Sequence, residues 1–299
     1  MQKLQGASST KSQAVNVSPN RFSKVKTVSK PVQLDTITPL VLTYNEEANI
    51  GRTLGRLSWA ERVVVVDSYS TDATTEIVEQ HDNAALVQRE FDDHTSQWNF
   101  GLDQVETEWT LSLDADYLVP DAFVEEVRRR TPPSALAGYR SSFVYCVQGR
   151  PLRGSLYPPR TVLFRPDRAR YVPDGHTQRL SAEGPVRALD TPLKHDDRKP
   201  LATWLDSQRR YARLEADKLA EADDVGLTDR LRRTNVLAPL LTPLYCLFVQ
   251  GLILDGWAGW HYTLQRTYAE VLLALVRVDA QLRSDVESES EAPYDRDPG

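Results

Sequence analysis

The chain has 299 residues, enough for one large domain with an appendage or for two modest domains. Apolar residues make up 40% and charged residues 26%, a balance typical of a globular protein and not of a disordered or fibrous one. The formal net charge of -6 argues against general nucleic-acid binding, which needs an excess of Lys and Arg on some face. We therefore expect no nucleic-acid partner.

The two cysteines give no sign of a structural cross-link or a metal cluster. Cys146 and Cys246 lie far apart and form no CxxC or Cys/His group, so neither a disulfide framework nor a zinc site is indicated. The first residues also lack the apolar core of a secretory signal. We expect the catalytic part to lie in the cytoplasm.

Both ends of the chain lack a regular apolar period. Residues 1–36 are rich in Ser, Lys and Gln and contain no acid before Asp35, which predicts a disordered basic tail. Residues 284–299 are acidic and aperiodic, which predicts a second disordered tail. The folded part is therefore expected between these tails.

Between the tails, apolar runs alternate with amphipathic stretches. Strand-like runs end at Thr43, Asp67 and Asp114, and the stretches EEANIGRTLGRL, TDATTEIVEQ and HTSQWNFGLDQV have helical patterns. This order predicts an α/β fold with a parallel sheet and helices on both faces. Because the carboxyl ends of such strands line the ligand crevice, the polar residues that end the three strands are expected to meet at one site.

The pattern changes after this first half. Strand-like runs with Pro-, Gly- and Arg-rich turns continue to about residue 198, so we predict one domain over 37–198. A helical period follows, which predicts a helical region over 199–283.

Part of the helical region suits a membrane. Residues 234–254 carry no formal charge and are long enough to cross the hydrocarbon core of a bilayer, but Pro239 and Pro243 interrupt a straight helix. Trp257 and Trp260 follow, and such rings favour the headgroup level. We predict helices that lie in or dip into the membrane face, with a buried core helix pair as the alternative.

Asp114 and Asp116 follow the buried run WTLSL and are candidates for a metal site. Mg²⁺ and Mn²⁺ prefer oxygen ligands and take one or two protein carboxylates while substrate phosphates complete the shell. We assign Asp116 to the metal and Asp114 to a ribose or a metal-bound water. A solvated turn or helix cap is the alternative for any such acid pair.

The ends of the first two strands offer nucleotide contacts. Asp67 closes the run VVVV and is able to accept hydrogen bonds from a base N–H or a sugar hydroxyl, whereas Asp72 fits the start of a helix. Tyr44 offers a flat ring for a base. Glu46 is either a ligand contact or an acid in the first turn of a helix.

The strings LTYNEEANI, VVVDSYSTDAT, QWNFGL and LSLDAD, in this order, resemble the nucleotide-binding half of family 2 glycosyltransferases with the GT-A fold. The resemblance extends over roughly residues 37 to 280 and points to the lipopolysaccharide core β-glucosyltransferase branch. It implies a GT-A-like, Rossmann-like mixed sheet flanked by helices and a reaction that inverts the anomeric centre. By this resemblance the nucleotide is held by Thr43, Tyr44, Glu46 and Asp67, and the diphosphate is held through Mn²⁺ or Mg²⁺ by Asp114 and Asp116.

The general base is less clearly marked. Enzymes of this branch often show a His-Glu pair after an Arg-containing strand, and in RTVLFRPDRARYVPDGHTQRL His176 has a counterpart but Thr177 replaces the Glu. Asp174 is the nearest carboxylate and our candidate base, with His176 as its rival or as an orienting neighbour. A Pro-Asp-Gly turn without chemistry is the alternative.

Three further residues complete the predicted site. The resemblance implies a late histidine that reaches the metal or diphosphate, and we assign this role to His195 in LKHDDRK, although a lone His is more often structural. Arg160 and Arg198 are the candidates for bidentate contacts with phosphate, although most surface arginines are merely solvated.

These features predict an inverting, divalent-metal-dependent glycosyltransferase. We expect a nucleotide-diphosphate sugar donor, with UDP as the expected nucleotide, and a lipid-linked or polysaccharide acceptor at the cytoplasmic face of the inner membrane, where the protein would be peripheral or monotopic. A nucleotidyltransferase would need a Gly-rich phosphate loop with a basic residue, which LTYNEEANI lacks. The alternative is a non-catalytic sugar-nucleotide-binding or scaffold protein of the same fold, favoured by the missing Glu after His176.

Overall fold

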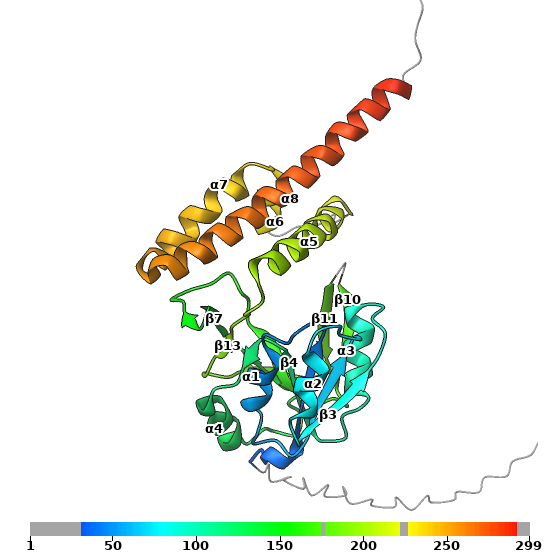
Figure 1. Ribbon diagram of the computed structural model, residues 1–299, viewed down its shortest axis with the longest axis vertical. Helices are drawn as coiled ribbons and strands as arrows, with labels where there is room; N and C mark the ends of the chain where they lie inside the picture. Colours follow the sequence, from blue (N-terminus) through cyan, green and yellow to red (C-terminus); the bar gives the residue numbers. More distant parts are fainter. Residues whose placement is uncertain (1–30, 175–176, 222–226, 292–299) are drawn as a thin grey trace, which may run out of the picture.

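The computed structural model describes residues 31–174, 177–221 and 227–291. Figure 1 shows two parts, an α/β part that contains the sheets and a helical part that lies above it. The chain passes once from the first part to the second, between residues 195 and 201. This division agrees with the change of pattern in the sequence.

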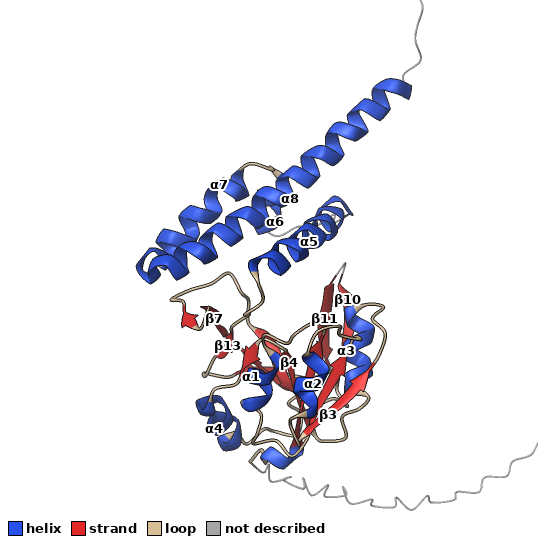
Figure 2. Ribbon diagram, viewed as in Figure 1, coloured by secondary structure: helices blue, strands red, loops and turns tan. Residues whose placement is uncertain are grey.

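Within the described residues, seven strands form the central sheet in the order β12-β6-β9-β4-β1-β2-β3. The neighbours β3, β2, β1 and β4 run parallel, whereas β9 is antiparallel to both β4 and β6, so the predicted mixed sheet is confirmed (Figure 2). The strands are β1 (Ile37–Thr43), β2 (Val63–Asp67), β3 (Ala84–Gln88), β4 (Trp109–Asp114), β6 (Gly138–Ser141), β9 (Arg160–Phe164) and β12 (Val186–Ala188).

Helices cover both faces of this sheet, which explains why its strands are apolar runs without alternation. Val63 and Val65 of β2 point into one core with the helices α1 (Ile50–Gly55), α2 (Thr74–Glu79) and α4 (Asp121–Arg129). Val64 and Val66 point to the other face and pack with the helix α3 (His94–Leu102). Each valine in the run is fully buried.

Two smaller sheets are attached to the central one. The strands β5 (Tyr117–Leu118), β13 (Leu193–His195), β7 (Phe143–Val147) and β8 (Arg150–Pro151) form one of them, in that order. The antiparallel pair β10 (Ala169–Asp174) and β11 (Thr177–Ala182) forms the other. This hairpin packs on α3, where the rings of Trp98 and Tyr171 stack with centroids 5.2 Å apart.

The helical part begins with α5 (Leu201–Glu221) and α6 (Leu227–Arg233). It continues through α7 (Leu237–Leu244), the π-helical segment η2 (Tyr245–Val249), the 3₁₀ segment η3 (Leu252–Asp255) and α8 (Gly256–Glu291). α5 packs on α8 through Ala216, Leu219 and Leu273. Arg232 of α6 forms ion pairs with Glu215 and Glu270, which joins the three helices.

The chain turns back on itself between η2 and α8. Gly251 and Gly256 both have positive φ angles, 72° and 58°, which L side chains rarely adopt. A Cβ on Gly259 would lie 1.9 Å from the backbone oxygen of Leu252, so only glycine allows η3 to pack so closely on the first turn of α8. These glycines fix the bend, which we call the hairpin bend, residues 250–259.

Of the described helices, none alone has the length and apolar character to cross a bilayer. The segments Leu237–Val249 and Leu252–Val286 meet that requirement as a pair, with a bend of 70° between them. α7 contains no buried residue, so the alternative of a buried core helix pair does not describe it.

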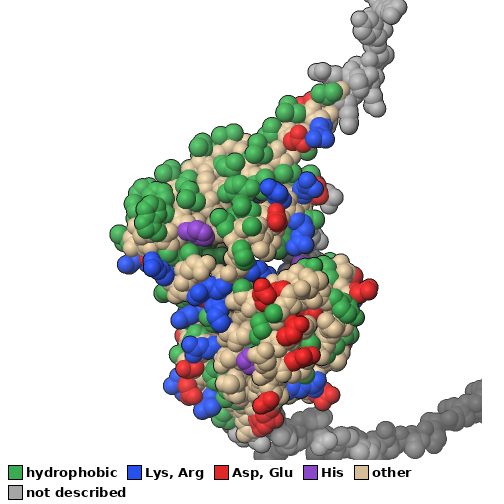
Figure 3. All heavy atoms as spheres, viewed as in Figure 1, with side chains coloured by type: hydrophobic (Ala, Val, Ile, Leu, Met, Phe, Trp, Pro, Cys, Tyr) green, Lys and Arg blue, Asp and Glu red, His purple; other side chains and the backbone are tan. Residues whose placement is uncertain are grey.

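The hairpin bend and its flanking helices carry a large exposed apolar surface, visible as the green cluster over the helical part in Figure 3. Trp257 is 86% exposed and Val249 and Leu254 are each 69% exposed. We call this surface the apolar hairpin surface; it comprises Leu237, Leu240, Leu241, Leu244, Tyr245, Phe248, Val249, Ile253, Leu254, Trp257, Trp260 and Leu264.

Parts of both predicted tails are folded in the structure. Residues Leu34–Thr36 form the 3₁₀ turn η1, and Val32 is buried in the core, so the prediction of disorder up to residue 36 was wrong at its end. The helix α8 continues to Glu291, past the predicted end of the helical region at 283, because Glu and Ser residues extend a helix that is already nucleated. Residues 1–30 and 292–299 lie outside the described part.

Candidate functional site

The ends of β1, β2 and β4 meet at one edge of the central sheet, as the sequence predicts. Thr43 is in register with Asp67 on one side, and Leu42 is in register with Asp114 on the other. The hydroxyl of Thr43 donates a hydrogen bond to Oδ1 of Asp67 at 2.9 Å. In an open α/β sheet this edge is where ligands bind.

Asp67 is fully buried and is held by the protein itself. It accepts hydrogen bonds from the hydroxyl of Thr43, the backbone N–H and the hydroxyl of Ser70, and Nε2 of Gln88. Ser70 in turn accepts from the backbone N–H of Asn45. Asp67 therefore orders the loops after β1 and β2, and its predicted contact with a nucleotide stays a prediction.

Two tyrosines stand open to solvent on these loops. Tyr44 is 57% exposed and Tyr69 is 52% exposed. Tyr69 has a positive φ of 57°, a strained conformation that the hydrogen bonds of Asp67 to Ser70 hold in place. Two flat aromatic side chains are thus available at the edge where a base would stack.

Asp116 and His195 form a pair at the same edge. Nε2 of His195 lies 3.0 Å from Oδ2 of Asp116, and the two side chains are only 13% and 18% exposed. The strand pairing of β13 with β5 brings them together, because His195 is in register with Tyr117. The second oxygen, Oδ1 of Asp116, is buried and has no hydrogen-bond partner among the described residues.

The pKa shifts of this pair favour its charged form. Burial raises the pKa of Asp116, but the charge and hydrogen bond of His195 outweigh burial and lower it. Burial lowers the pKa of His195, but the charge and hydrogen bond of Asp116 outweigh burial and raise it. The pair is therefore an ion pair with one carboxylate oxygen left over.

Three tyrosines surround His195. The ring centroids of Tyr145 and Tyr157 lie 4.6 Å from its centroid, and that of Tyr117 lies 5.4 Å away. Tyr145 also contacts Tyr262 of α8, with centroids 4.8 Å apart. Aromatic packing thus connects the histidine to the helical part.

Asp114 and Arg160 lie within electrostatic reach of each other. The side chain of Asp114 has no hydrogen-bond partner among the described residues, and its charge acts on His94, Tyr157 and Arg160. Burial lowers the pKa of Arg160, but Tyr117, Tyr157 and Asp114 outweigh burial and raise it. The guanidinium lies 5.1 Å from the ring centroid of Tyr157.

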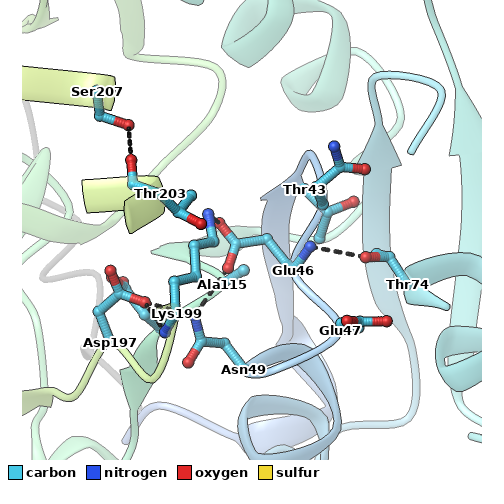
Figure 4. Close-up of polar contacts among 12 residues, drawn as sticks. Thr43, Glu46, Glu47, Asn49, Thr74, Ala115, Asp197, Lys199, Thr203 and Ser207 are labelled. Carbon is cyan, nitrogen blue, oxygen red and sulfur yellow. Dashed lines mark hydrogen bonds and ion pairs between the residues drawn. The ribbon is translucent and has the colours of Figure 1, made fainter. Parts of the chain in front are cut away.

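Glu46 is engaged by a lysine that the sequence analysis did not single out. Figure 4 shows Glu46 pointing toward Lys199, with Thr203 of α5 nearby. The side chains of Glu46 and Lys199 form an ion pair. Nδ2 of Asn49 donates to Glu46 and to Asp197, at 2.9 Å in each case. Burial raises the pKa of Glu46 to about 7, although Lys199 opposes this shift.

Arg198 is occupied in a similar way. Its Nε and Nη2 donate to the two oxygens of Asp196 at 3.0 and 2.9 Å, a bidentate pair. Asp196 is 2% exposed and also accepts from Arg52 of α1 and from the backbone N–H of Gly149. Arg198 therefore holds the segment between β13 and α5 in this structure, and its predicted contact with phosphate stays a prediction.

The candidate base lies at the far end of the β10–β11 hairpin. Asp174 is the last residue of β10, and its backbone pairs with Thr177 of β11. Gly175 lies outside the described residues, so the alternative of a Pro-Asp-Gly turn without chemistry also stays a prediction. His176 lies outside the described residues, so the roles of Asp174 and His176 stay predictions.

The residues present fit a divalent cation that is shared with a substrate. No group of three or more His, Cys, Asp or Glu side chains suited to a metal occurs in the described part. Mg²⁺ and Mn²⁺ need only one or two carboxylates when phosphates supply the other ligands. Asp116 has a buried oxygen without a partner, and Asp114 comes from the same strand end. His195 faces Asp116 instead of an open position.

Residues 40–131, which contain Thr43, Asp67, Asp114 and Asp116, match the family model described as glycosyl transferase family 2. Residues 40–131 therefore carry a glycosyl transferase family 2 domain, about a third of the chain, and this match and that to a named glycosyltransferase support a glycosyltransferase.

Among curated proteins, the chain is 26% identical over 238 residues to the lipopolysaccharide core biosynthesis glycosyltransferase LpsC of Rhizobium meliloti (strain 1021), a match that covers 75% of this chain and 85% of LpsC.

Two solved structures are similar at low identity. One is the mannosyltransferase PcManGT of Pyrobaculum calidifontis in complex with GDP-Man and Mn²⁺, with 19% identity, a TM-score of 0.47 and coverage of 84% of this chain and 87% of that one. The other is glucosyl-3-phosphoglycerate synthase of Mycobacterium tuberculosis with Mn²⁺, UDP and phosphoglyceric acid, with 15% identity, a TM-score of 0.43 and coverage of 65% and 81%.

Proposed function

We propose that this glycosyltransferase moves a sugar from a nucleotide-diphosphate donor, with UDP as the expected nucleotide, to a lipid-linked or polysaccharide acceptor, and that it inverts the anomeric centre. The observation that carries the proposal is the edge formed by β1, β2 and β4, where Asp114 and Asp116 lie beside the ordered Asp67 loop. The match of residues 40–131 to the family model covers the whole of this edge. The match to LpsC supports a lipopolysaccharide-type acceptor.

The free oxygen of Asp116 supports a divalent cation in the reaction. A buried carboxylate oxygen without a partner is costly, and a cation bound there would satisfy it. Mn²⁺ or Mg²⁺ bound by Asp116, with Asp114 nearby, would stabilise the charge that develops on the departing diphosphate. His195 keeps Asp116 in its charged form and holds its other oxygen in place.

The remaining residues would hold the donor and direct the attack. Tyr44 or Tyr69 offers a ring for the base, and Arg160, which lies near Asp114, offers a charge for the diphosphate. In an inverting transfer one carboxylate takes the proton of the acceptor hydroxyl as that oxygen attacks the anomeric carbon. Asp174, with His176 beside it in sequence, is our candidate for this base.

We also place the reaction at the cytoplasmic face of a membrane, with the protein peripheral or monotopic. The apolar hairpin surface supports this location, because contiguous exposed apolar patches of this extent mark contact with a protein or a membrane. Trp257 and Trp260 at the hairpin bend have the amphipathic rings that favour the headgroup level. A lipid-linked acceptor would then reach the site from the side of the helical part.

The test is nucleotide release by the full chain in mild detergent, with UDP-, GDP- and dTDP-sugars and with Mn²⁺ or Mg²⁺. Metal-dependent release from one donor, lost in Asp116→Asn, is the expected result. Asp121→Asn is the matched control, because Asp121 carries the same charge at the start of α4 and its side chain is 94% exposed.

Binding without turnover has a different meaning. If calorimetry detects nucleotide binding but no acceptor preparation supports release, the chain is the non-catalytic sugar-nucleotide-binding protein of the alternative hypothesis. If no nucleotide binds in the presence of either metal, the proposed function is wrong.

A further inference from the structure

A hollow of about 420 Å³ lies along one face of α5, away from the carboxylates of the sheet edge. Its lining consists of Asp206, Arg209, Arg210, Arg213 and Leu214, which recur at helical spacing on a single face. Three positive charges and one negative charge therefore border the same space. None of these side chains has a role in the proposed function.

The arginines of this hollow are weakly engaged within the protein. Arg209 lies 3.5 Å from Asp206, but the two side chains are 70% and 75% exposed, so water weakens the pair. Arg210 contacts only the ring of Tyr211 among the described residues, at 5.3 Å from its centroid. Arg213 has no hydrogen bond or ion pair within the described part of the chain.

Several other arginines are paired with buried acids. Near the catalytic edge, Arg52 and Arg198 both bind Asp196, and in the helical part Arg232 binds Glu215 and Glu270. Guanidinium groups that converge on a hollow without enough carboxylates have free donors in the fork geometry that phosphate and carboxylate match. The hollow is therefore suited to an anion from outside the chain.

The hollow lies on the helix that directly follows the segment beside the sheet edge. α5 begins at Leu201, two residues after Lys199, whose side chain is paired with Glu46 (Figure 4). At 1.5 Å per residue, Arg210 and Arg213 lie roughly 14 to 18 Å along α5 from its first residue. The charges of Arg210 and Asp114 both act on His94 at the start of α3, so both groups lie within electrostatic reach of this histidine.

This position separates the arginines from the donor contacts. The donor is expected against β1, β2 and β4, where Asp116 and Asp114 would bind its diphosphate through the cation. A group bound at Arg210 and Arg213 would approach from the helical part, which also carries the apolar hairpin surface. An acceptor anchored in a membrane would approach from that same side.

We propose that Arg209, Arg210 and Arg213 form an acceptor subsite that binds a phosphate group carried by the acceptor. The proposal rests on the proposed function, because it assumes that a sugar is transferred at the edge beside Asp114 and Asp116. It adds the substrate class: the acceptor is a phosphorylated glycan or glycolipid. Asp206 limits the affinity for anions by neutralising part of the charge.

The experiment uses the full chain in mild detergent, saturated with UDP and Mn²⁺, and titrates it with glucose 6-phosphate, with glucose as the neutral counterpart. Glucose 6-phosphate is expected to bind more tightly than glucose. The double variant Arg210→Gln/Arg213→Gln is expected to weaken glucose 6-phosphate binding by at least about tenfold and to leave glucose unchanged. Asp206→Asn is expected to strengthen glucose 6-phosphate binding.

The matched control is Arg128→Gln on α4. Arg128 is an exposed arginine paired with an acid three residues away, like Arg209 with Asp206, but it lies on the other part of the molecule. Binding of UDP with Mn²⁺, measured by calorimetry, is expected to be unchanged in every variant. A loss of UDP affinity in the double variant would assign the arginines to the donor and overturn the acceptor subsite.

A second arm tests bilayer lipid as the source of the phosphate. Flotation with phosphatidylcholine vesicles, with and without phosphatidylglycerol, is expected to give equal binding for the double variant and the unmodified chain. If the variant instead loses its preference for phosphatidylglycerol while glucose 6-phosphate does not bind the unmodified chain, the subsite is a membrane contact and the proposal is wrong. A chain that binds no nucleotide would overturn the proposed function, and its glucose 6-phosphate titration would still decide the arginine site.

Discussion

The α/β part and the helical part treat their apolar side chains in opposite ways. In the α/β part the runs of β1, β2 and β4 are covered on both faces. Among its described residues, only Tyr44, Tyr69, Phe91 and Leu156 are large apolar side chains exposed to solvent. In the helical part α7 buries none of its residues, and Trp257 is 86% exposed. The first part covers its apolar core, whereas the second leaves a large apolar surface exposed.

Under the proposed function, the α/β part carries out the chemistry and the helical part holds the protein at a membrane. Polar side chains in the α/β part are ordered by one another, as Asp67 is by Thr43 and Ser70. The helical part contacts this ordered site through Tyr262 and through the segment before α5. Changes in one part should therefore affect turnover and changes in the other should affect location.

The largest effect is expected from Asp116→Asn. The change keeps the shape of the side chain but removes the charge that the cation requires, so nucleotide release should fall by roughly a thousandfold, about 4 kcal/mol of transition-state stabilisation. Vesicle flotation should be unchanged, because Asp116 lies in the α/β part. Near-normal release would remove Asp116 from the metal site, and a parallel loss of flotation would mean that the two parts are not separable.

A smaller effect is expected from Trp257→Ala at the hairpin bend. Removing this 86% exposed ring should weaken binding to phosphatidylcholine vesicles by roughly tenfold to a hundredfold, which corresponds to the 1.5–3 kcal/mol gained when such a side chain is buried. Phe91→Ala is the control, because Phe91 is 48% exposed but lies in the α/β part. Equal losses in the two variants would contradict a specific hairpin contact.

Gly259→Ala tests whether the hairpin bend depends on close packing. A methyl group there would lie 1.9 Å from the backbone oxygen of Leu252, so the bend must open, at a cost of about 1–3 kcal/mol. Gly55→Ala at the end of α1 meets no atom within 4 Å and should instead gain about 0.5–1 kcal/mol. Thermal unfolding and limited proteolysis of both variants check this, and an unchanged melting temperature in Gly259→Ala would refute it.

The smallest expected effect is on the pH dependence of stability, and it arises in the α/β part alone. Burial raises the pKa of Glu126, but the backbone N–H groups of Asp190 and Thr191 and the guanidinium of Arg130 outweigh burial and lower it from 4.5 to about 2. A lowered carboxyl pKa adds stability above about pH 4.5 that is lost as the pH falls toward 2.

Glu126→Gln should therefore lower the free energy of unfolding by about 1–2 kcal/mol at neutral pH. The difference between the two proteins should shrink as the pH is lowered from 4.5 toward 2, in urea unfolding followed by tryptophan fluorescence. A difference that stays constant over this range would show that the carboxylate charge is not the source.

The features predicted correctly are those that a short segment determines. The run VVVV is buried on both faces of the sheet and is followed by Asp67, and the buried run WTLSL is followed by Asp114. The strands and their polar ends can therefore be predicted from the local pattern. The predicted end of the N-terminal tail, at residue 36, was wrong because Val32 is buried against residues that are distant in sequence. Local composition does not report such contacts.

The site residues that the sequence analysis did not single out have distant partners. Glu46 and Lys199 are 153 positions apart, and Asp196 binds an arginine 144 positions away. In LKHDDRK the sequence pointed only to His195 and Arg198. Asp196, Asp197 and Lys199 nevertheless arrange the polar contacts around Asn49, Arg52 and Glu46. A dense run of charges directly after a strand was the available signal.

The placement of Lys199 bears on how this protein can be divided or recombined. The predicted boundary between its two parts falls between residues 198 and 199, yet Lys199 reaches back to Glu46 and its backbone N–H donates to Asp197. A shortened protein cut at that boundary would lose the ion pair of a half-buried glutamate beside the site. A functional module must therefore include Lys199, and a graft of the helical part onto another transferase would have to supply an equivalent lysine.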